Sequence, residues 1–231
     1  MNIHGFTKTT LLDYPGQVAS CIFTGGCNFR CPFCHNGELV LNPNAFPRIE
    51  EDEIFEHLNK RKNVLYGVCI TGGEPTLQPD LLRFMEKVKA LELSVKLDTN
   101  GYNPAVISDA LRSNLVDYIA MDIKAGRDNY ARATGVAGID ISVIEDSASI
   151  IMNSNIDYEF RTTAVRGIHD EHDFEDISKW LAGESHYFLQ SYKANDAVID
   201  QSCAAFAKDT LIDYLEILRT TIPNAELRGV D

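Results

Sequence analysis

The sequence lacks any long uncharged apolar run. No window approaches the roughly 18 consecutive apolar residues from which a membrane-spanning helix is predicted. Residues 1–17 contain neither an apolar core nor a small-residue cleavage site, so the pattern of a secretory signal peptide is missing as well. We therefore expect no membrane partner and a cytoplasmic location, where cysteine thiols stay reduced.

Basic residues are also scarce, because 21 Lys and Arg face 34 Asp and Glu, giving a formal net charge of −13. A surface this acidic repels phosphate backbones, so nucleic acid is not expected as a partner. The sequence has no Pro/Gly/Ser-rich linker, no low-complexity tract and no long internal repeat. These absences, with 231 residues and 45% hydrophobic composition, predict a single domain over 1–231 that buries its own core.

Short apolar runs alternate with amphipathic stretches along the chain. Six runs are strand-like, at 18–23, 68–71, 94–97, 117–123, 157–165 and 186–190. Helical spacing of apolar residues is found at 50–58, 79–91, 104–111, 141–152, 174–181 and 208–220. Repeated β–α units predict an α/β fold with a parallel sheet, either open and doubly wound or an incomplete (β/α) barrel. In both architectures ligands bind at the carboxyl ends of the strands.

The cysteines are the most informative feature, and they stand at positions 21, 27, 31, 34, 69 and 203. Cys27, Cys31 and Cys34 have the spacing CxxxCxxC, and three thiolates on one loop can bind a single iron–sulfur cluster. A four-iron cluster held by three cysteines leaves one iron open to an outside ligand, which favours catalysis over electron storage. Cys21 and Cys69 are expected to pack inside strands, whereas no role is predicted for the sixth cysteine.

Three other interpretations of the cysteine loop stay open. Zinc could bind the three thiolates together with His35, although the adjacent Cys34 and His35 would be strained on one ion. The CPFC tetrapeptide has the spacing of a thioredoxin-type redox pair, but such a pair normally opens a helix and leaves Cys27 unexplained. Chance clustering of buried cysteines is the third interpretation, and the density of the cluster disfavours it.

The cysteine loop and its surroundings resemble a known family. An aromatic residue, Phe33, stands just before the third cysteine, as in radical S-adenosylmethionine (SAM) enzymes. The segments DYPG (13–16), FTGGCNFRC (23–31) and HN (35–36) are similar to glycyl-radical-enzyme activases, above all to those of anaerobic ribonucleotide reductase. The similarity implies a partial (β/α)6 TIM-like barrel of the radical SAM type, with a core at about 16–195 and a C-terminal helical extension at about 204–222.

A second motif ends the second predicted strand, where Gly72, Gly73, Glu74 and Pro75 stand in sequence. Two glycines let the backbone approach a ligand closely, and the carboxylate of Glu74 suits an amino group. The same residues are also typical of a tight strand-to-helix turn. By resemblance to the family, this segment binds the methionine amino group of SAM.

Charged residues interrupt the next strands. Asp122 and Lys124 stand within the apolar fourth strand, and Arg161 lies mid-to-late in the fifth. Ionisable groups in a parallel strand are seldom left unpaired, so mutual ion pairs are the alternative to ligand binding. Resemblance to the family places Arg161 near the methionine carboxylate.

Asp98, Thr99 and Asn100 follow the third strand, where they could form no more than a turn and a helix entry. By resemblance to pyruvate formate-lyase activase, Asp98, Thr99 and Asp122 help form a monovalent cation site beside the methionine carboxylate. The cation is therefore a third expected cofactor, after one 4Fe-4S cluster and SAM.

The resemblance implies an oxidoreductase in which Cys27, Cys31 and Cys34 hold the cluster. Reduced flavodoxin or ferredoxin would supply one electron, and SAM would be cleaved to methionine and a 5′-deoxyadenosyl radical. That radical would take hydrogen from a glycine of a partner, most closely anaerobic ribonucleoside-triphosphate reductase. Asp13 to Gly16 would line the barrel mouth through which the partner enters, although Tyr14 replaces a glycine of the family's DGPG.

Other functions fit the same residues. The chain could activate another glycyl radical enzyme, such as pyruvate formate-lyase, or act by radical SAM chemistry on a small metabolite. From a different class, it could be a non-catalytic zinc or thiol redox protein.

Overall fold

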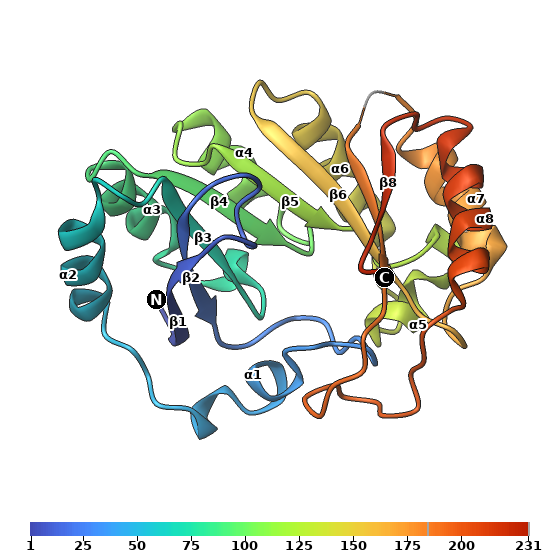
Figure 1. Cartoon of the computed structure of the whole chain (residues 1–231), viewed down its shortest axis with the longest axis horizontal. Coiled ribbons are helices and arrows are strands. Elements are labelled where there is room, and N and C mark those ends of the chain that lie inside the picture. Colours follow the sequence, from blue (N-terminus) through green and yellow to red (C-terminus); the bar gives the residue numbers. More distant parts are fainter. Residues whose placement is uncertain (184, 231) are drawn as a thin grey trace.

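Eight strands form one curved sheet in the computed structural model, which describes residues 1–183 and 185–230. Their order in the sheet is the order in the chain, from β1 at one edge to β8 at the other (Figure 1). The strands are β1 Ile3–Thr10, β2 Ala19–Thr24, β3 Gly67–Gly72, β4 Ser94–Thr99, β5 Tyr118–Asp122, β6 Asp157–Ala164, β7 Tyr187–Ser191 and β8 Ala225–Arg228.

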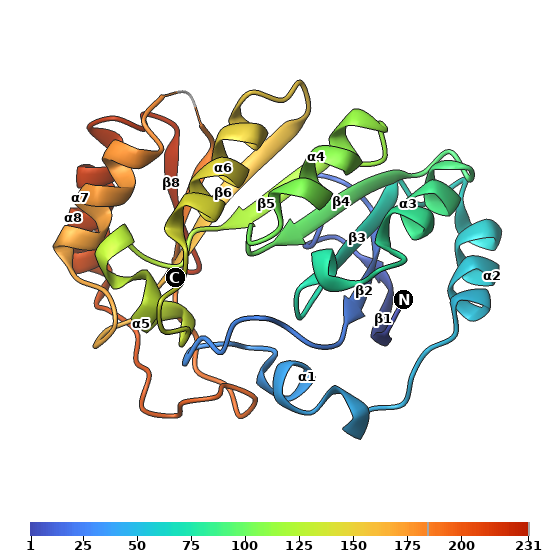
Figure 2. The ribbon, with the colours of Figure 1, turned by 180° about the vertical axis from the view of Figure 1, so that it is seen from behind.

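The strands from β2 to β8 pair in parallel, and only β1 pairs antiparallel with its neighbour β2 among the strands described. Helices connect the parallel strands and cover the outer face of the sheet, as Figure 2 shows from behind. Parallel strands need such crossover connections, and a twisted sheet of this kind curls into a partial barrel. The predicted α/β class and the partial TIM-like barrel are therefore confirmed.

Most of the helices follow the amphipathic stretches, and two five-residue helices, Gly37–Leu41 and Tyr130–Thr134, were not predicted. The helices are α1 Gly37–Leu41, α2 Glu51–Arg61, α3 Leu81–Lys89, α4 Pro104–Arg112, α5 Tyr130–Thr134, α6 Ile141–Met152, α7 Glu171–Trp180 and α8 Lys208–Arg219. In α3 the buried residues are Leu81, Phe84, Met85 and Val88, a stripe that faces the sheet. None of the helices in the described ranges is long and apolar enough to cross a membrane.

Helix ends are fixed by local side chains. The carboxylate of Asp140 accepts a hydrogen bond from the Ser142 amide at the start of α6. Asp170 and Asp173 form a capping box at the start of α7, so the first amides of that helix have partners.

Two strands were not predicted from the sequence. β1 is a half-exposed edge strand with polar residues along most of its length, so it lacks a continuous apolar run. β8 has only four residues, Ala225–Arg228, and follows α8 in a further parallel β–α–β unit on β7. The extension expected at about 204–222 contains the helix α8, and β8 adds a strand of the main sheet just after it.

The interior of the sheet is apolar where the sequence predicted strands. Cys21 and Cys69 are fully buried and lie side by side in the register of β2 and β3, which confirms them as packing residues. Each strand thus carries its ligand-facing residues at its carboxyl end, beyond a buried apolar stretch.

Candidate active site

A cavity of about 490 Å³ lies inside the barrel, beneath the loop that follows β2. Every predicted site residue lines it except Pro75, which is buried at the start of a short 3-10 turn, Pro75–Leu77. The predicted residues that share the cavity are Cys27, Cys31, Phe33, Cys34, Gly72, Gly73, Glu74, Asp98, Thr99, Asn100, Asp122, Lys124 and Arg161. Residues from five separate strand ends or loops therefore converge on one space.

The cysteine loop is anchored by segments that are distant in sequence. The Arg30 amide donates to the Thr134 carbonyl at 2.8 Å, which ties the loop to the end of α5. On the other side, the Asp200 amide donates to the Pro32 carbonyl at 2.8 Å. The contacts of the loop therefore extend past residue 195, the expected end of the core.

The three thiols lie in a low-dielectric setting. Burial raises the pKa of Cys27 to about 11 and that of Cys31 to about 12, and it also raises the pKa of Cys34. The nearby Lys124 ammonium opposes this shift at all three thiols. Metal ligation requires thiolates, so iron binding would displace the protons that burial retains.

The geometry disfavours the zinc interpretation. His35 is engaged elsewhere, since its Nε2 lies 2.7 Å from the Lys193 carbonyl oxygen. Within residues 1–183 and 185–230, no three His, Cys, Asp or Glu side chains are placed to hold one metal ion. A four-iron cluster takes each thiolate on a different iron, so its ligands need not meet at one point. The loop fits a cluster better than a single ion.

Both glycines of the second motif are required by a close approach of two turns. A side chain at Gly73 would place Cβ 1.9 Å from the Gly26 carbonyl oxygen, and Gly72 has a φ of +112°. The Glu74 amide donates to the same Gly26 carbonyl at 2.8 Å. Asn36 adds a side-chain bond at 2.8 Å to the Gly72 carbonyl oxygen. These contacts hold the turn after β3 against both ends of the cysteine loop, at Gly26 and Asn36.

Glu74 differs from its expected role as an open acceptor. Its side chain is fully buried and accepts hydrogen bonds from the Thr76 amide at 3.0 Å, the Thr76 hydroxyl at 2.6 Å and the Thr99 hydroxyl at 2.8 Å. A fourth bond, at 2.7 Å, comes from the Asn100 amide. A carboxylate accepts about four hydrogen bonds, so these donors use its capacity. Glu74 braces the ends of β3 and β4 against each other.

Asn100 connects this brace to the cysteine loop. Its Nδ2 donates to the Asn28 side-chain oxygen at 2.8 Å and lies 3.7 Å from the Cys27 sulfur. The Phe29 amide donates to the same sulfur at 3.3 Å. The Cys27 sulfur therefore has two donors directed at it, which would stabilise negative charge there.

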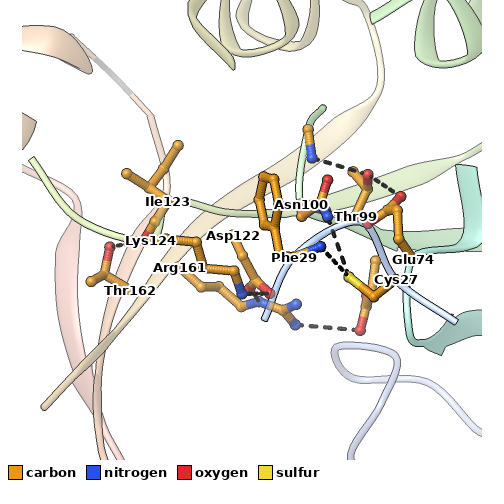
Figure 3. A network of polar contacts seen from close by, with 12 residues as sticks. Cys27, Phe29, Glu74, Thr99, Asn100, Asp122, Ile123, Lys124, Arg161 and Thr162 are labelled. Carbon is orange, nitrogen blue, oxygen red and sulfur yellow. Dashed lines mark hydrogen bonds and ion pairs between the residues drawn. The ribbon is translucent and has the colours of Figure 1, made fainter. Parts of the chain in front are cut away.

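Ion pairs join the charged residues of β4, β5 and β6. Asp122 accepts from Lys124 at 2.8 Å and from the Arg161 Nε at 2.9 Å, and Figure 3 shows both cations directed at it. A weaker contact of 3.5 Å links Arg161 to Asp98. Burial alone would raise the pKa of Asp122, but the two cations hold it below its usual range. The ion pairs weighed as the alternative from the sequence are thus present, and they lie in the cavity wall.

The residues predicted for a monovalent cation already have partners in the chain. The Thr99 hydroxyl donates to Glu74, and Asp122 is paired as described above. The carboxylate of Asp98 contacts the ammonium of Lys96, a buried residue two positions earlier on β4. The two carboxylates are therefore paired with the chain's own cations, and the Thr99 hydroxyl is engaged by Glu74, so this set does not fit a free cation well.

Some lining residues were missed by sequence reasoning. Thr71, Thr163 and Gln190 line the cavity from the ends of β3, β6 and β7. Their only sequence signal is a place at the carboxyl end of a strand, which neutral residues do not make conspicuous. Lys96, which contacts the lining residue Asp98, was also missed, although a charged residue within an apolar strand is the signal that marked Asp122 and Lys124.

The segment Asp13–Gly16 lies elsewhere than predicted. Tyr14 is buried against the rings of Tyr66 and Tyr118, at centroid distances of 5.3 and 5.9 Å. Those two residues mark the starts of β3 and β5, so the segment is at the amino ends of the strands, opposite the cysteine loop. Asp13 still lines the cavity, which therefore runs through the barrel from one end toward the other.

Comparison with known proteins agrees with this arrangement. The family model described as the Radical SAM superfamily matches residues 21–181. A protein of Methanocaldococcus jannaschii, provisionally named a glycyl-radical enzyme activating enzyme, is 33% identical over 84% of this chain and 81% of its own length. The pyruvate formate-lyase 1-activating enzyme of Escherichia coli is 26% identical, over 74% of this chain and 70% of its own.

Solved structures show the same fold at low sequence identity. Methylornithine synthase aligns with a TM-score of 0.63 and 15% identity, over 90% of this chain and 63% of that one. The structure of TYW1 with a lysine-pyruvate adduct aligns with a TM-score of 0.61 over 88% and 74%. The matched family model spans the cysteine loop, the glycine turn and the ion pairs up to Arg161. The chain belongs to the radical SAM superfamily and is a glycyl-radical-enzyme activating enzyme of that superfamily.

Proposed function

We propose that the protein activates anaerobic ribonucleoside-triphosphate reductase by generating a glycyl radical on it. The observation that supports the radical SAM chemistry is the convergence of Cys27, Cys31 and Cys34 on the cavity that also holds the glycine turn and the Arg161–Asp122–Lys124 ion pairs. The choice of the reductase as partner rests on the sequence of the DYPG segment and the cysteine loop. The chemistry that a bound 4Fe-4S cluster supplies is one-electron cleavage of SAM to methionine and a 5′-deoxyadenosyl radical. The role of the chain is to bind, orient and shield.

In this proposal Cys27, Cys31 and Cys34 would hold the cluster at the wall of the cavity. The backbone of Gly72 and Gly73 lines the cavity and would face the methionine amino group, in a turn whose close approach to Thr24 and Gly26 leaves no space for side chains. Glu74 keeps that turn in register with β4 by its four accepted hydrogen bonds. Restricting the bound substrate in this way lowers the entropic cost of reaching a reactive geometry.

Lys124 and Arg161 are the proposed partners of the methionine carboxylate. Lys124 follows the carboxyl end of β5, and Arg161 lies in the second half of β6. The side chains of both residues are more than four-fifths buried. Arg161 can offer its guanidinium bidentately, and a cation in a low-dielectric site attracts a carboxylate more strongly than in water. Phe33 is buried beside the cysteines and packs edge-on against His169, so it fixes the loop rather than binding polar groups.

Activation of a different glycyl radical enzyme is the second candidate. The similarity to the Escherichia coli pyruvate formate-lyase 1-activating enzyme supports pyruvate formate-lyase as that partner. The DYPG segment and the cysteine-loop sequence support the reductase instead. Both candidates use the same cavity and the same first step.

A reduced flavodoxin or ferredoxin is the proposed electron donor, acting in the reducing environment of the cytoplasm. Such donors are acidic, and this chain has a net charge of −13, so docking requires a local basic surface. The exposed run Lys60-Arg61-Lys62 at the end of α2 offers one.

The test is an anaerobic activation assay with purified partners. The reconstituted protein, SAM and a reductant are mixed separately with anaerobic ribonucleoside-triphosphate reductase and with pyruvate formate-lyase from the source organism. We expect a glycyl radical signal by electron paramagnetic resonance with the reductase, accompanied by release of 5′-deoxyadenosine. A signal only with pyruvate formate-lyase would move the proposal to the second candidate, and a colourless zinc protein would end both.

A further inference from the structure

Lys96 is a charged residue inside the barrel that the site described above does not require. It lies on β4 with its side chain only 3% exposed. Its ammonium contacts the Asp98 carboxylate, lies 3.8 Å from the Cys69 sulfur and sits 5.8 Å from the centre of the Tyr118 ring. A buried lysine is costly unless it is paired, so this position has a specific electrostatic role.

The neighbouring charges show what that role is. Asp98 has two basic partners, Lys96 and Arg161, and Asp122 also has two, Arg161 and Lys124. Lys96, Arg161 and Lys124 thus neutralise these two carboxylates along the wall of the cavity, and Arg161 also lies 3.8 Å from the buried Glu159 carboxylate. A free sodium or potassium ion at Asp98 would have to compete with the Lys96 ammonium and the Arg161 guanidinium that already contact this carboxylate. Electrostatics therefore disfavours a free cation while Lys96 is present.

We propose that the Lys96 ammonium occupies the role of a bound monovalent cation at Asp98 and makes the enzyme independent of sodium and potassium. Lys96 acts as a positioning residue: it holds Asp98, and Thr99 and Asn100 continue from Asp98 into the contacts with Glu74. This inference rests on the proposed SAM site but not on the identity of the partner enzyme.

A covalently attached cation has a physical advantage over a free one. Its effective concentration at Asp98 is fixed by the strand, so the pair forms without recruiting an ion from solution. The two residues are separated by one position, and alternate residues of a strand point to the same face. Lys96 and Asp98 therefore face the barrel interior together whenever β4 is formed.

The test compares thermal unfolding of the wild-type chain and the Lys96→Met variant. Both are purified with the cluster under anaerobic conditions and studied without SAM, in sodium, potassium or choline chloride at equal ionic strength. We expect the same Tm for the wild type in all three salts. Lys96→Met should lose about 10 °C in choline, because Asp98 loses its nearest counter-charge. Sodium or potassium should restore part of that loss in a saturable way.

Two further variants isolate the site. Lys89→Met removes a lysine that pairs with Asp117 at 2.7 Å in a partly exposed position, and it should show no specific response to sodium or potassium. Lys96→Met combined with Asp98→Asn should lose the salt response, because no carboxylate is left to bind the ion. If Lys96→Met does not fold in any salt, Lys96→Gln, which keeps a neutral donor, is measured in its place.

A saturable dependence of the wild-type Tm on sodium or potassium would overturn the inference, as would a Tm of Lys96→Met, or of Lys96→Gln if that variant is measured in its place, that is the same in all three salts. A parallel measurement of SAM binding should show the same pattern, with affinity restored by the small cation in the variant only. The unfolding measurement needs neither SAM nor a partner enzyme. Its result therefore tests the role of Lys96 even if the activation assay shows that the proposed function is wrong.

Discussion

The backbone amide of Asn100 donates to the Glu74 carboxylate at 2.7 Å, which joins the ends of β3 and β4 inside the barrel. The same asparagine directs its side chain toward the Cys27 sulfur. One path of hydrogen bonds therefore runs from the glycine turn through β4 to a proposed cluster ligand (Figure 3). The geometry of the proposed SAM site and that of the cysteine loop are consequently coupled.

Glu74→Gln should weaken both the fold and SAM binding. An amide nitrogen cannot accept the bonds from Thr99 or Asn100, so a buried donor is left without a partner. We expect the free energy of unfolding to fall by about 1.5–3 kcal/mol in urea titrations. Glu86→Gln, on the exposed face of α3, is the matched control and should change neither quantity. Wild-type stability in the Glu74 variant would show that the brace is dispensable.

Cys27→Ala, Cys31→Ala and Cys34→Ala should each abolish binding of the cluster. The wild-type protein should contain about four irons per chain and be brown, whereas the variants should be nearly iron-free. Iron analysis and visible absorption after anaerobic reconstitution measure this. Cys203→Ala is the control, because Cys203 does not line the cavity. Equal iron loss in the control would assign that cysteine a role that the structure does not give it.

Asn100→Ala should lower the reduction potential of the cluster. Hydrogen bonds to cysteinyl sulfur stabilise the more negative, reduced state, so removal of a donor favours the oxidised state. A redox titration followed by electron paramagnetic resonance measures the shift. Asn103→Ala removes a bond of 3.0 Å to the Thr76 carbonyl, away from the cysteines, and should leave the potential unchanged. A potential in Asn100→Ala equal to that of the wild type would argue against the proposed contact.

Stability should decrease as pH falls below about 6.5, because of His169. Burial lowers the pKa of this imidazole, whose Nδ1 accepts from the Val165 amide while Nε2 donates to the Lys124 carbonyl. The folded pKa is below the unfolded one, so the unfolded chain binds more protons. The stabilisation is complete above the unfolded pKa and is lost as pH falls toward the folded pKa.

Urea unfolding between pH 5 and 8 checks this expectation. His169→Gln should be less stable at pH 8 and should show a flatter pH dependence than the wild type. His172→Gln is the control, since that side chain is 69% exposed at the start of α7. A steep pH dependence that persists in His169→Gln would place the responsible group elsewhere.

Much of the fold was predictable from apolar periodicity. The strands from β2 to β7 are buried on both faces, so each is a short apolar run, and the helices between them have one apolar stripe. β1 and β8 escaped prediction because a half-exposed edge strand and a four-residue strand carry no such run. Their place depends on pairing with β2 and β7, which is a long-range property.

The amino-acid sequence by itself determined the family and predicted the ligand set: three cysteines at a fixed spacing on one loop, and polar residues at successive strand ends. Spacing along a chain is sufficient for those features, because a parallel sheet brings all its carboxyl ends to one edge. Only the tertiary structure decided which of these polar side chains already have hydrogen-bond or ion-pair partners within the chain. Glu74 is saturated by donors from two strands, and Asp98 is neutralised by Lys96. Such assignments depend on directions and distances between side chains across neighbouring strands, which a sequence pattern does not specify.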